Sequence, residues 1–136
     1  MKILVIGNFH HKNIEGLKRI LDFLKYDYYF TTTYSIRNLI NNYDIIISPC
    51  QPIDTSKYPE KKFIFGPHFS VFPTKKLLAI NNVHKNSVYI QPSKWAMDTW
   101  NMFNINNIIP VKTQFFPVNT DKFKPLENIQ RNKVFI

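Results

Sequence analysis

The chain has 136 residues, enough for one domain with a buried core and too few for two domains of ordinary size. Hydrophobic residues make up 44% and aromatic residues 15%, which excludes a disordered chain, and no apolar run reaches the roughly 18 residues that a membrane-spanning helix needs. The formal net charge of +9 favours anionic partners, such as phosphate groups, acidic glycans, nucleic acid or a membrane surface, without choosing among them.

Two further features of the sequence bear on location. The single cysteine, Cys50, has no second cysteine with which to form a disulfide, which agrees with a reducing compartment. The N-terminal run from Met1 to Gly7 is too short for the core of a secretory signal peptide and is more typical of a buried first strand. We therefore expect a cytoplasmic protein.

Strand-like and helix-like segments alternate along the chain. Residues 2–6 form a continuous apolar run, typical of a strand covered on both faces, and residues 7–12 form a loop. Within residues 14–26 apolar side chains recur at steps of three and four, which predicts an amphipathic helix that Asn13 caps. The further predicted elements are a strand at 28–33, a short helix at 35–41, strands at 43–48 and 62–65, a helix from 73 to about 80, a strand at 87–90, a helix at 94–103 capped by Ser93, and a strand at 108–113.

This alternation predicts an α/β, Rossmann-like fold: an open, mostly parallel six-stranded sheet with helices on both faces. The strand order 3-2-1-4-5-6 is the common one for such sheets, and ligands bind outside the carboxyl ends of the strands where the order reverses. We expect that point between the first and fourth strands. The loops at 7–13 and 66–73 would then lie side by side.

Several nucleotide and metal sites find no support in the sequence. A dinucleotide site needs several glycines after the first strand and an acidic residue after the second, and a P-loop needs Gly-Lys-Ser or Gly-Lys-Thr. Neither pattern occurs, and the chain has only 3 glycines. The histidines lack the spacing of metal ligands. We expect no cofactor and no metal in this chain.

The loop after the first strand is the first candidate site. It leads into a helix N-terminus, where free backbone N–H groups can bind an anion or a sugar hydroxyl. Gly7, Asn8 and Lys12 are candidate binding residues, and His10 and His11 are candidates for hydroxyl contact or for the catalytic base. The alternative is a polar loop that is merely exposed to solvent.

Two later loops offer similar chemistry. In the loop at 66–73, His68 is a third candidate base, Phe69 could stack on a sugar face and Ser70 could bond a hydroxyl, unless the aromatic rings simply pack beneath the loop. In the loop at 91–95, Ser93 and Lys94 are candidate binding residues. The competing interpretation there is structural, because serine is a good helix cap and Trp95 suits the core.

Three segments together resemble a known family. Residues 2–7 open like the N-terminal domain of two-domain (GT-B) glycosyltransferases of the family 4, or group 1, type. Residues 87–95 resemble the strand, serine and helix in which that family often has Val-Ser-x-Trp. Residues 115–125, Phe-Phe-Pro-Val-Asn-Thr-Asp-Lys-Phe-Lys-Pro, resemble the segment Pro-Asn-Gly-Val-Asp-Thr-Asp-Lys-Phe-x-Pro that leaves this domain, although Asn119 stands where the family has Asp and the Gly is missing.

The resemblance implies an N-terminal domain that binds a sugar or glycan acceptor, while a second domain binds the nucleotide-sugar donor. Residues 1–124 would be the Rossmann-like acceptor-side domain. Residues 125–136 would be a linker and the possible first strand of a second domain, present in cis or supplied by a partner chain. Asn119 and Asp121 would lie on the donor side of the hinge. The chain alone would be inactive in hexosyl transfer.

A different class of function stays open. Scattered lysines and aromatic residues also permit a stand-alone basic module that binds glycan or nucleic acid without catalysis, although no specific nucleic-acid motif is present. The charge also permits peripheral contact with a membrane. A third reading, a small Rossmann-like enzyme with its whole site in this chain, would need a phosphate loop or catalytic pair that the sequence lacks.

Overall fold

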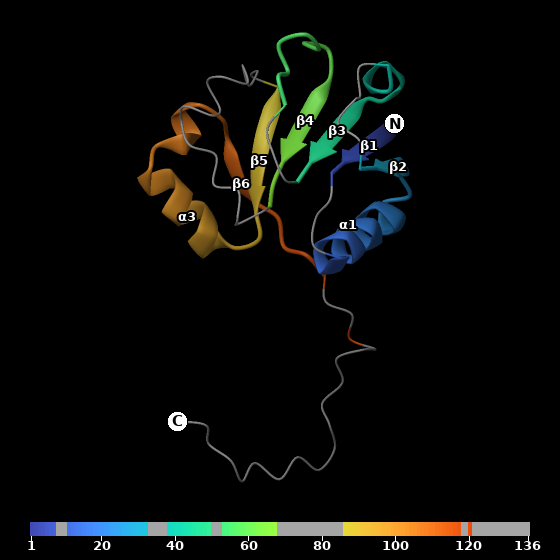
Figure 1. Ribbon diagram of the computed structural model, residues 1–136. Coiled ribbons are helices and arrows are strands. Elements are labelled where there is room, and N and C mark those ends of the chain that lie inside the picture. Colours follow the sequence, from blue (N-terminus) through green and yellow to red (C-terminus); the bar gives the residue numbers. More distant parts are fainter. Residues whose placement is uncertain (8–10, 33–37, 50–52, 68–85, 118–119, 121–136) are drawn as a thin grey trace, which may run out of the picture.

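A computed structural model gives the fold of residues 1–7, 11–32, 38–49, 53–67, 86–117 and 120 (Figure 1). These residues form one six-stranded sheet in the order β2-β1-β3-β4-β5-β6, and every strand pairing is parallel. The predicted Rossmann-like α/β fold is therefore confirmed. In chain order the elements are β1 (Lys2–Ile6), α1 (His11–Phe23), β2 (Asp27–Thr31), the 3-10 turn η1 (Ile40–Asn42), β3 (Ile45–Ser48), β4 (Lys62–Phe65), β5 (Ser87–Gln91), α3 (Lys94–Met102), the 3-10 turn η2 (Ile105–Asn107) and β6 (Val111–Thr113).

Helices cover both faces of the sheet. On one face Trp100 of α3 packs against Tyr89 of β5, with ring centroids 4.2 Å apart. The described buried residues form two core clusters, one on each face of the sheet. Leu17 and Leu21 of α1 belong to the second, on the opposite face. The strand residues of the first core cluster are Leu4, Ile6, Ile46, Phe63, Phe65 and Tyr89, and those of the second are Ile3, Val5 and Ile47. Alternation along β1 and β3 thus supplies both layers of the core.

The predicted strand order 3-2-1-4-5-6 is wrong, because β3 lies between β1 and β4 instead of at an edge. Burial gives the physical reason. Ile46 is 0% and Ile47 3% exposed, so β3 needs cover on both faces and a strand on each side. Tyr29 of β2 is 52% exposed and tolerates the edge. The order therefore reverses between β1 and β3.

This correction separates two loops that the sequence placed side by side. The end of β3 lies between Gly7, which follows β1, and Gly66, which follows β4. Neighbouring strands are 4.7–4.9 Å apart, so the two loops begin about 10 Å from each other. A single small group cannot bridge them, whereas an elongated ligand can.

Helix boundaries also differ from the sequence-based ones. Helix α1 begins at His11, so Asn13 lies inside its first turn and is not the cap. It ends at Phe23, although the apolar pattern continues to residue 26, because Lys25 adopts a left-handed conformation with φ 56°. The amide of Tyr26 then donates to the carbonyl of Leu21. Such a turn is a common helix end.

The remaining strands and the second helix lie close to their predicted positions. β4 has the predicted bounds, and α3 ends one residue before the predicted end. Strand β6 begins only at Val111, after η2 and Pro110. The predicted helix at 73–80 and the segment at 121–136, with the proposed domain boundary at 124 and 125, lie outside the described residues.

Candidate ligand site at the carboxyl edge of the sheet

All six strands end at the same edge of the sheet, because they are parallel (Figure 1). Along this carboxyl edge the strand ends follow one another as Thr31, Ile6, Ser48, Phe65, Gln91 and Thr113. Ligands of open α/β sheets bind outside this edge, beside the point where the strand order reverses. The edge is therefore the candidate site, with its reversal between the ends of β1 and β3.

Gly7 occupies the first position after β1. Its φ of 121° is one that glycine adopts readily, and its amide donates to the carbonyl of Thr31 over 2.8 Å. The Nζ atom of Lys18 lies 5.1 Å from the centroid of the Phe30 ring, a cation–π contact. Together with Ile14 and Thr32, these residues line a hollow of about 170 Å³. The predicted binding residue Gly7 thus borders an open space at the ligand edge.

Gly66 brings the chain after β4 directly against β5. Its φ is 90°, and a Cβ atom built there would lie 2.4 Å from the carbonyl oxygen of Ile90 and 2.5 Å from the ring of Tyr89. Only glycine fits such a close approach. Pro67 follows through a cis peptide bond. The backbone at the end of β4 therefore packs directly against the end of β5.

The two predicted binding residues after β5 both have partners within the chain. The Ser93 hydroxyl oxygen accepts from the amide of Ala96 over 3.2 Å and caps α3, as the structural interpretation of this residue expects. The Lys94 ammonium lies 2.6 Å from a carboxylate oxygen of Asp98, one helical turn along α3. The Lys94 ammonium of this exposed pair therefore lies along the surface of α3, beside Asp98.

Trp95 differs from its predicted place in the core. Its side chain is 72% exposed, whereas Trp100 is 2% exposed and packs on the sheet. The helix register explains the difference, because Ala96 and Trp100 are four residues apart and share the buried stripe. An indole in the first turn of α3, directly after the carboxyl end of β5, is a large apolar surface beside the candidate site.

The structure does not describe most of the other predicted site residues. His11 and Lys12 form the first two residues of α1, but only their backbone is described. The remaining predicted residues, namely His10, His68, Asn8, Phe69, Ser70, Asn119 and Asp121, lie outside the described residues. Their proposed roles stay predictions. Sequence reasoning missed the exposure of Trp95, which the spacing of Ala96 and Trp100 could have indicated.

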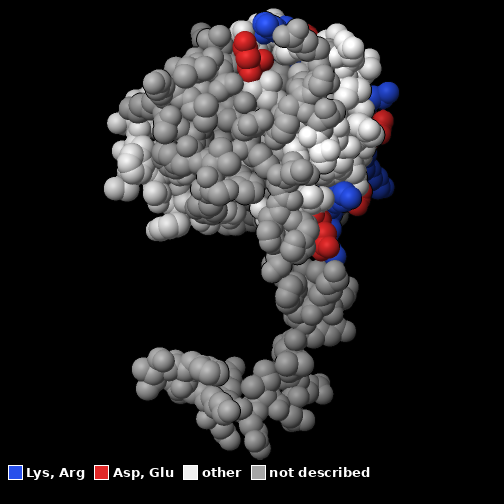
Figure 2. Space-filling view, viewed as in Figure 1, with Lys and Arg blue, Asp and Glu red and all other residues white. Residues whose placement is uncertain are grey.

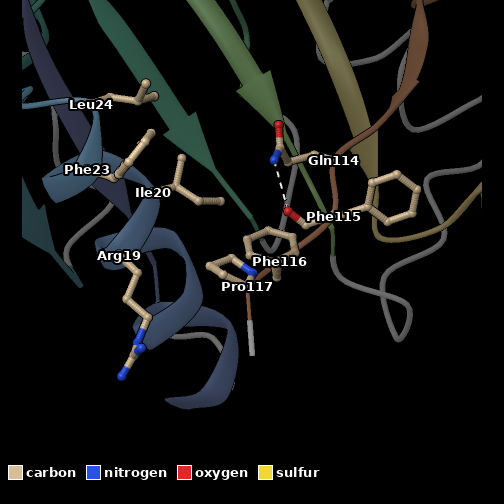
Figure 3. Close-up of a pocket in the computed structure, with 8 residues that line it drawn as sticks. All are labelled: Arg19, Ile20, Phe23, Leu24, Gln114, Phe115, Phe116 and Pro117. Atoms are coloured by element: carbon tan, nitrogen blue, oxygen red, sulfur yellow. Dashed lines mark hydrogen bonds between the residues drawn. The ribbon is translucent and has the colours of Figure 1, made fainter. Parts of the chain in front are cut away.

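A second open space lies beside α1 (Figure 3). After β6 the residues from Gln114 to Pro117 run to α1, and with that helix they border a groove of about 640 Å³. Phe116 packs so closely that a Cβ added to Gly16 would lie 3.0 Å from its ring. Phe23 is 85% and Phe115 69% exposed. In Figure 3 the guanidinium group of Arg19 points away from these rings.

The described ranges contain neither a metal-binding cluster nor a membrane-spanning helix. Within them, no group of three or more His, Cys, Asp or Glu side chains could hold a metal ion. Neither α1 nor α3 is long and apolar enough to cross a membrane. Comparison with known proteins adds no assignment: no protein-family model, curated protein or solved structure matches this chain.

Proposed function

We propose that this chain is the acceptor-binding half of a GT-B glycosyltransferase, which transfers a sugar from a nucleotide-sugar donor and is inactive without its second domain. The three family-like segments support the proposal, and so does the Rossmann-like sheet, in which the first two segments include β1 and β5. The proposal includes a cytoplasmic location, in agreement with the single cysteine.

One observation carries the proposal. The family-like segment begins at Phe115, two residues after the sixth strand ends, and residues 114–117 run from the carboxyl end of β6 to α1 (Figure 1). There the amide of Gln114 donates to the carbonyl of Gln91 over 2.8 Å. A following domain would be tethered on the side to which an acceptor binds, as a cleft between two domains requires.

The chemistry of the edge suits a sugar. The apolar C–H face of a pyranose can pack on the indole of Trp95, while its hydroxyls need hydrogen-bonding groups beside that ring. Gly66 leaves backbone close to such a ligand, and an elongated acceptor could extend from there to Gly7. These groups bind and orient an acceptor but do not bind a diphosphate.

Transfer requires three further contributions. An acceptor hydroxyl must lose its proton to a base, for which His10, His11 and His68 remain the proposed candidates. The diphosphate leaving group must be stabilised by positive groups close to the sugar, a role that belongs to the donor-side domain in this proposal. Both reactants must also be held together in a closed cleft. One half therefore binds without catalysing.

The test compares binding and turnover with the purified chain. We expect it to bind a neutral sugar with an affinity that changes little between 50 and 200 mM salt, and to release no sugar from any nucleotide-sugar donor. A coding sequence that continues past Ile136 for about 150 residues, an ordinary domain length, would supply the missing half. Turnover by the 136-residue chain alone would contradict the proposal.

The basic binding module is the alternative outcome of the same experiment. A polyanion site loses affinity steeply with salt, because each phosphate contact releases counterions. On the face seen in Figure 2, the described Lys and Arg side chains lie among Asp and Glu at the margins and form no continuous patch. Strong, salt-sensitive polyanion binding without sugar binding would favour the module.

A further inference from the structure

The hollow beside Gly7 combines an open space at the carboxyl edge with a positive charge. It lies where β1 and β2 end and has a volume of about 170 Å³. Among the described residues that line it, Lys18 alone carries a charge. The two nearest acidic residues of α1, Glu15 and Asp22, are not part of the lining. A group that enters the hollow therefore meets an ammonium and no carboxylate from the described lining.

The Lys18 side chain is held at the hollow by an aromatic ring. Its Nζ atom lies 5.1 Å from the centroid of the Phe30 ring, which is itself part of the lining. A cation over the face of a ring keeps its full charge and its N–H donors. Within the described part of the chain, none of the ion pairs involves Lys18, and the Asp22 carboxylate accepts from the Tyr28 hydroxyl instead. The ammonium can therefore donate to a ligand.

The make-up of the hollow favours a carboxylate on a sugar over a phosphate. A single ammonium balances a single negative charge, whereas phosphate is typically bound by several donors or by the planar fork of arginine. Ile14 and Phe30 offer apolar surface for the C–H groups of a sugar ring, and Thr32, the first residue after β2, carries a hydroxyl. These features together suit an acidic sugar.

We propose that this hollow is a second subsite for the acceptor, in which the Lys18 ammonium binds the carboxylate of a uronic acid. The inference rests on the proposed function and names the chemical class of its substrate: a glycan that contains both a neutral sugar and a uronic acid. The chain positions at Gly7 and Gly66 are about 10 Å apart, so an elongated acceptor can place its neutral sugar at Gly66 and its acidic sugar at Gly7.

The experiment titrates the full chain with matched glycosides and follows the backbone amides by NMR. The acidic probes are the methyl glycosides of glucuronic and galacturonic acid. The neutral probes are those of glucose and galactose, in which a hydroxymethyl group replaces the carboxylate. We expect the acidic glycosides to shift the amides of Gly7 and Thr32 most, and the neutral ones to leave both unchanged. Salt screens an exposed ion pair, so binding at Gly7 should weaken as the ionic strength rises.

Three variants test the role of Lys18. Lys18→Met removes the charge at an exposed helix position that tolerates methionine, so the fold should persist. Its affinity for the acidic glycosides should fall at least about threefold, with neutral-sugar binding at Gly66 unchanged. Lys18→Arg keeps the charge and should restore the binding. Lys112→Met is the matched control, because it removes an exposed lysine from β6, at the other end of the sheet, and should bind like the wild type.

The outcomes separate the inference from the proposed function. Equal affinity of the wild type and Lys18→Met for the acidic glycosides would overturn the inference while neutral-sugar binding stands. Inorganic phosphate that shifts the amides of Gly7 and Thr32 as strongly as the acidic glycosides would also overturn it, because the hollow would then be a general anion site. A wild type that binds none of the four glycosides would overturn the proposed acceptor role, and the inference with it.

Discussion

At the scale of single residues, one side-chain hydrogen bond joins α1 to the strand that follows it. The hydroxyl of Tyr28 on β2 donates to a carboxylate oxygen of Asp22 over 2.7 Å. This bond is the main cause that raises the pKa of Tyr28 above the ordinary tyrosine value, with smaller contributions from burial and from the Asp22 charge. The bond links the two elements whose ends border the hollow at Gly7.

The raised pKa of Tyr28 gives a pH prediction. A group whose pKa is higher in the folded state stabilises the fold fully below its unfolded pKa, near 10, and the contribution is lost as pH rises through the folded pKa. Asp22→Ala should bring the Tyr28 pKa back towards 10, as followed by NMR of the labelled ring. Asp98→Ala, on α3 at the opposite face, should leave it unchanged. An unaltered pKa in Asp22→Ala would contradict the assignment.

Residue roles were harder to predict from the sequence than residue positions. The cap role of Ser93 follows from its place before an apolar stripe, and the structure confirms it. The exposure of Trp95 follows from the local spacing of Ala96 and Trp100, which share the buried stripe of α3. The close approach of Gly66 to Ile90 joins residues distant in sequence, so the local pattern does not predict it.

At the scale of elements, residues 114–117 and α1 pack against each other. Phe116 lies against Gly16 in the middle of α1 and joins the core cluster of Ile3, Val5, Leu17, Leu21 and Ile47. A glycine inside a helix normally costs about 1 kcal/mol relative to alanine. Here the missing side chain of Gly16 leaves room for the Phe116 ring, so this packing accounts for a glycine inside α1.

A double-mutant cycle tests this packing. Phe116→Ala should cost about 1–2 kcal/mol, less than a fully buried phenylalanine, because the ring is half-buried. Gly16→Ala should stabilise the Phe116→Ala chain by about 1 kcal/mol and the wild type by less, because the methyl group meets the ring. Denaturant unfolding measures all four chains, and Phe115→Ala, at a 69% exposed position, is the near-neutral control. Equal gains in both backgrounds would show that Phe116 does not pack on α1.

Element types were predictable because their signals are local. Apolar runs identified the strands, and the three- and four-residue spacing identified α1 and α3. The start of α1 does not follow from the pattern, because Asn13-Ile14 looks like a cap and first turn, whereas the helix already includes His11. Its end was misjudged because left-handed Lys25 leaves no trace in the apolar pattern.

At the scale of the whole molecule, the fold class followed from the sequence but the strand order did not. Alternating elements predict a parallel sheet, whereas the position of β3 depends on competition among strands for cover on both faces. The run of three isoleucines at 45–47 was the available signal for a central place. The correct order moves the reversal point to β1 and β3 and leaves the carboxyl edge as the candidate site.

The most direct test of the account is to map sugar binding onto the backbone amides by NMR. On titration with a neutral methyl glycoside, we expect the largest amide shifts at the carboxyl ends of β4 and β5, at Gly66, Gln91 and Trp95. The amides of Lys2 and Ser87, which begin β1 and β5 at the amino edge, should stay unchanged. Shifts confined to the amino edge or to the groove beside α1 would contradict the account.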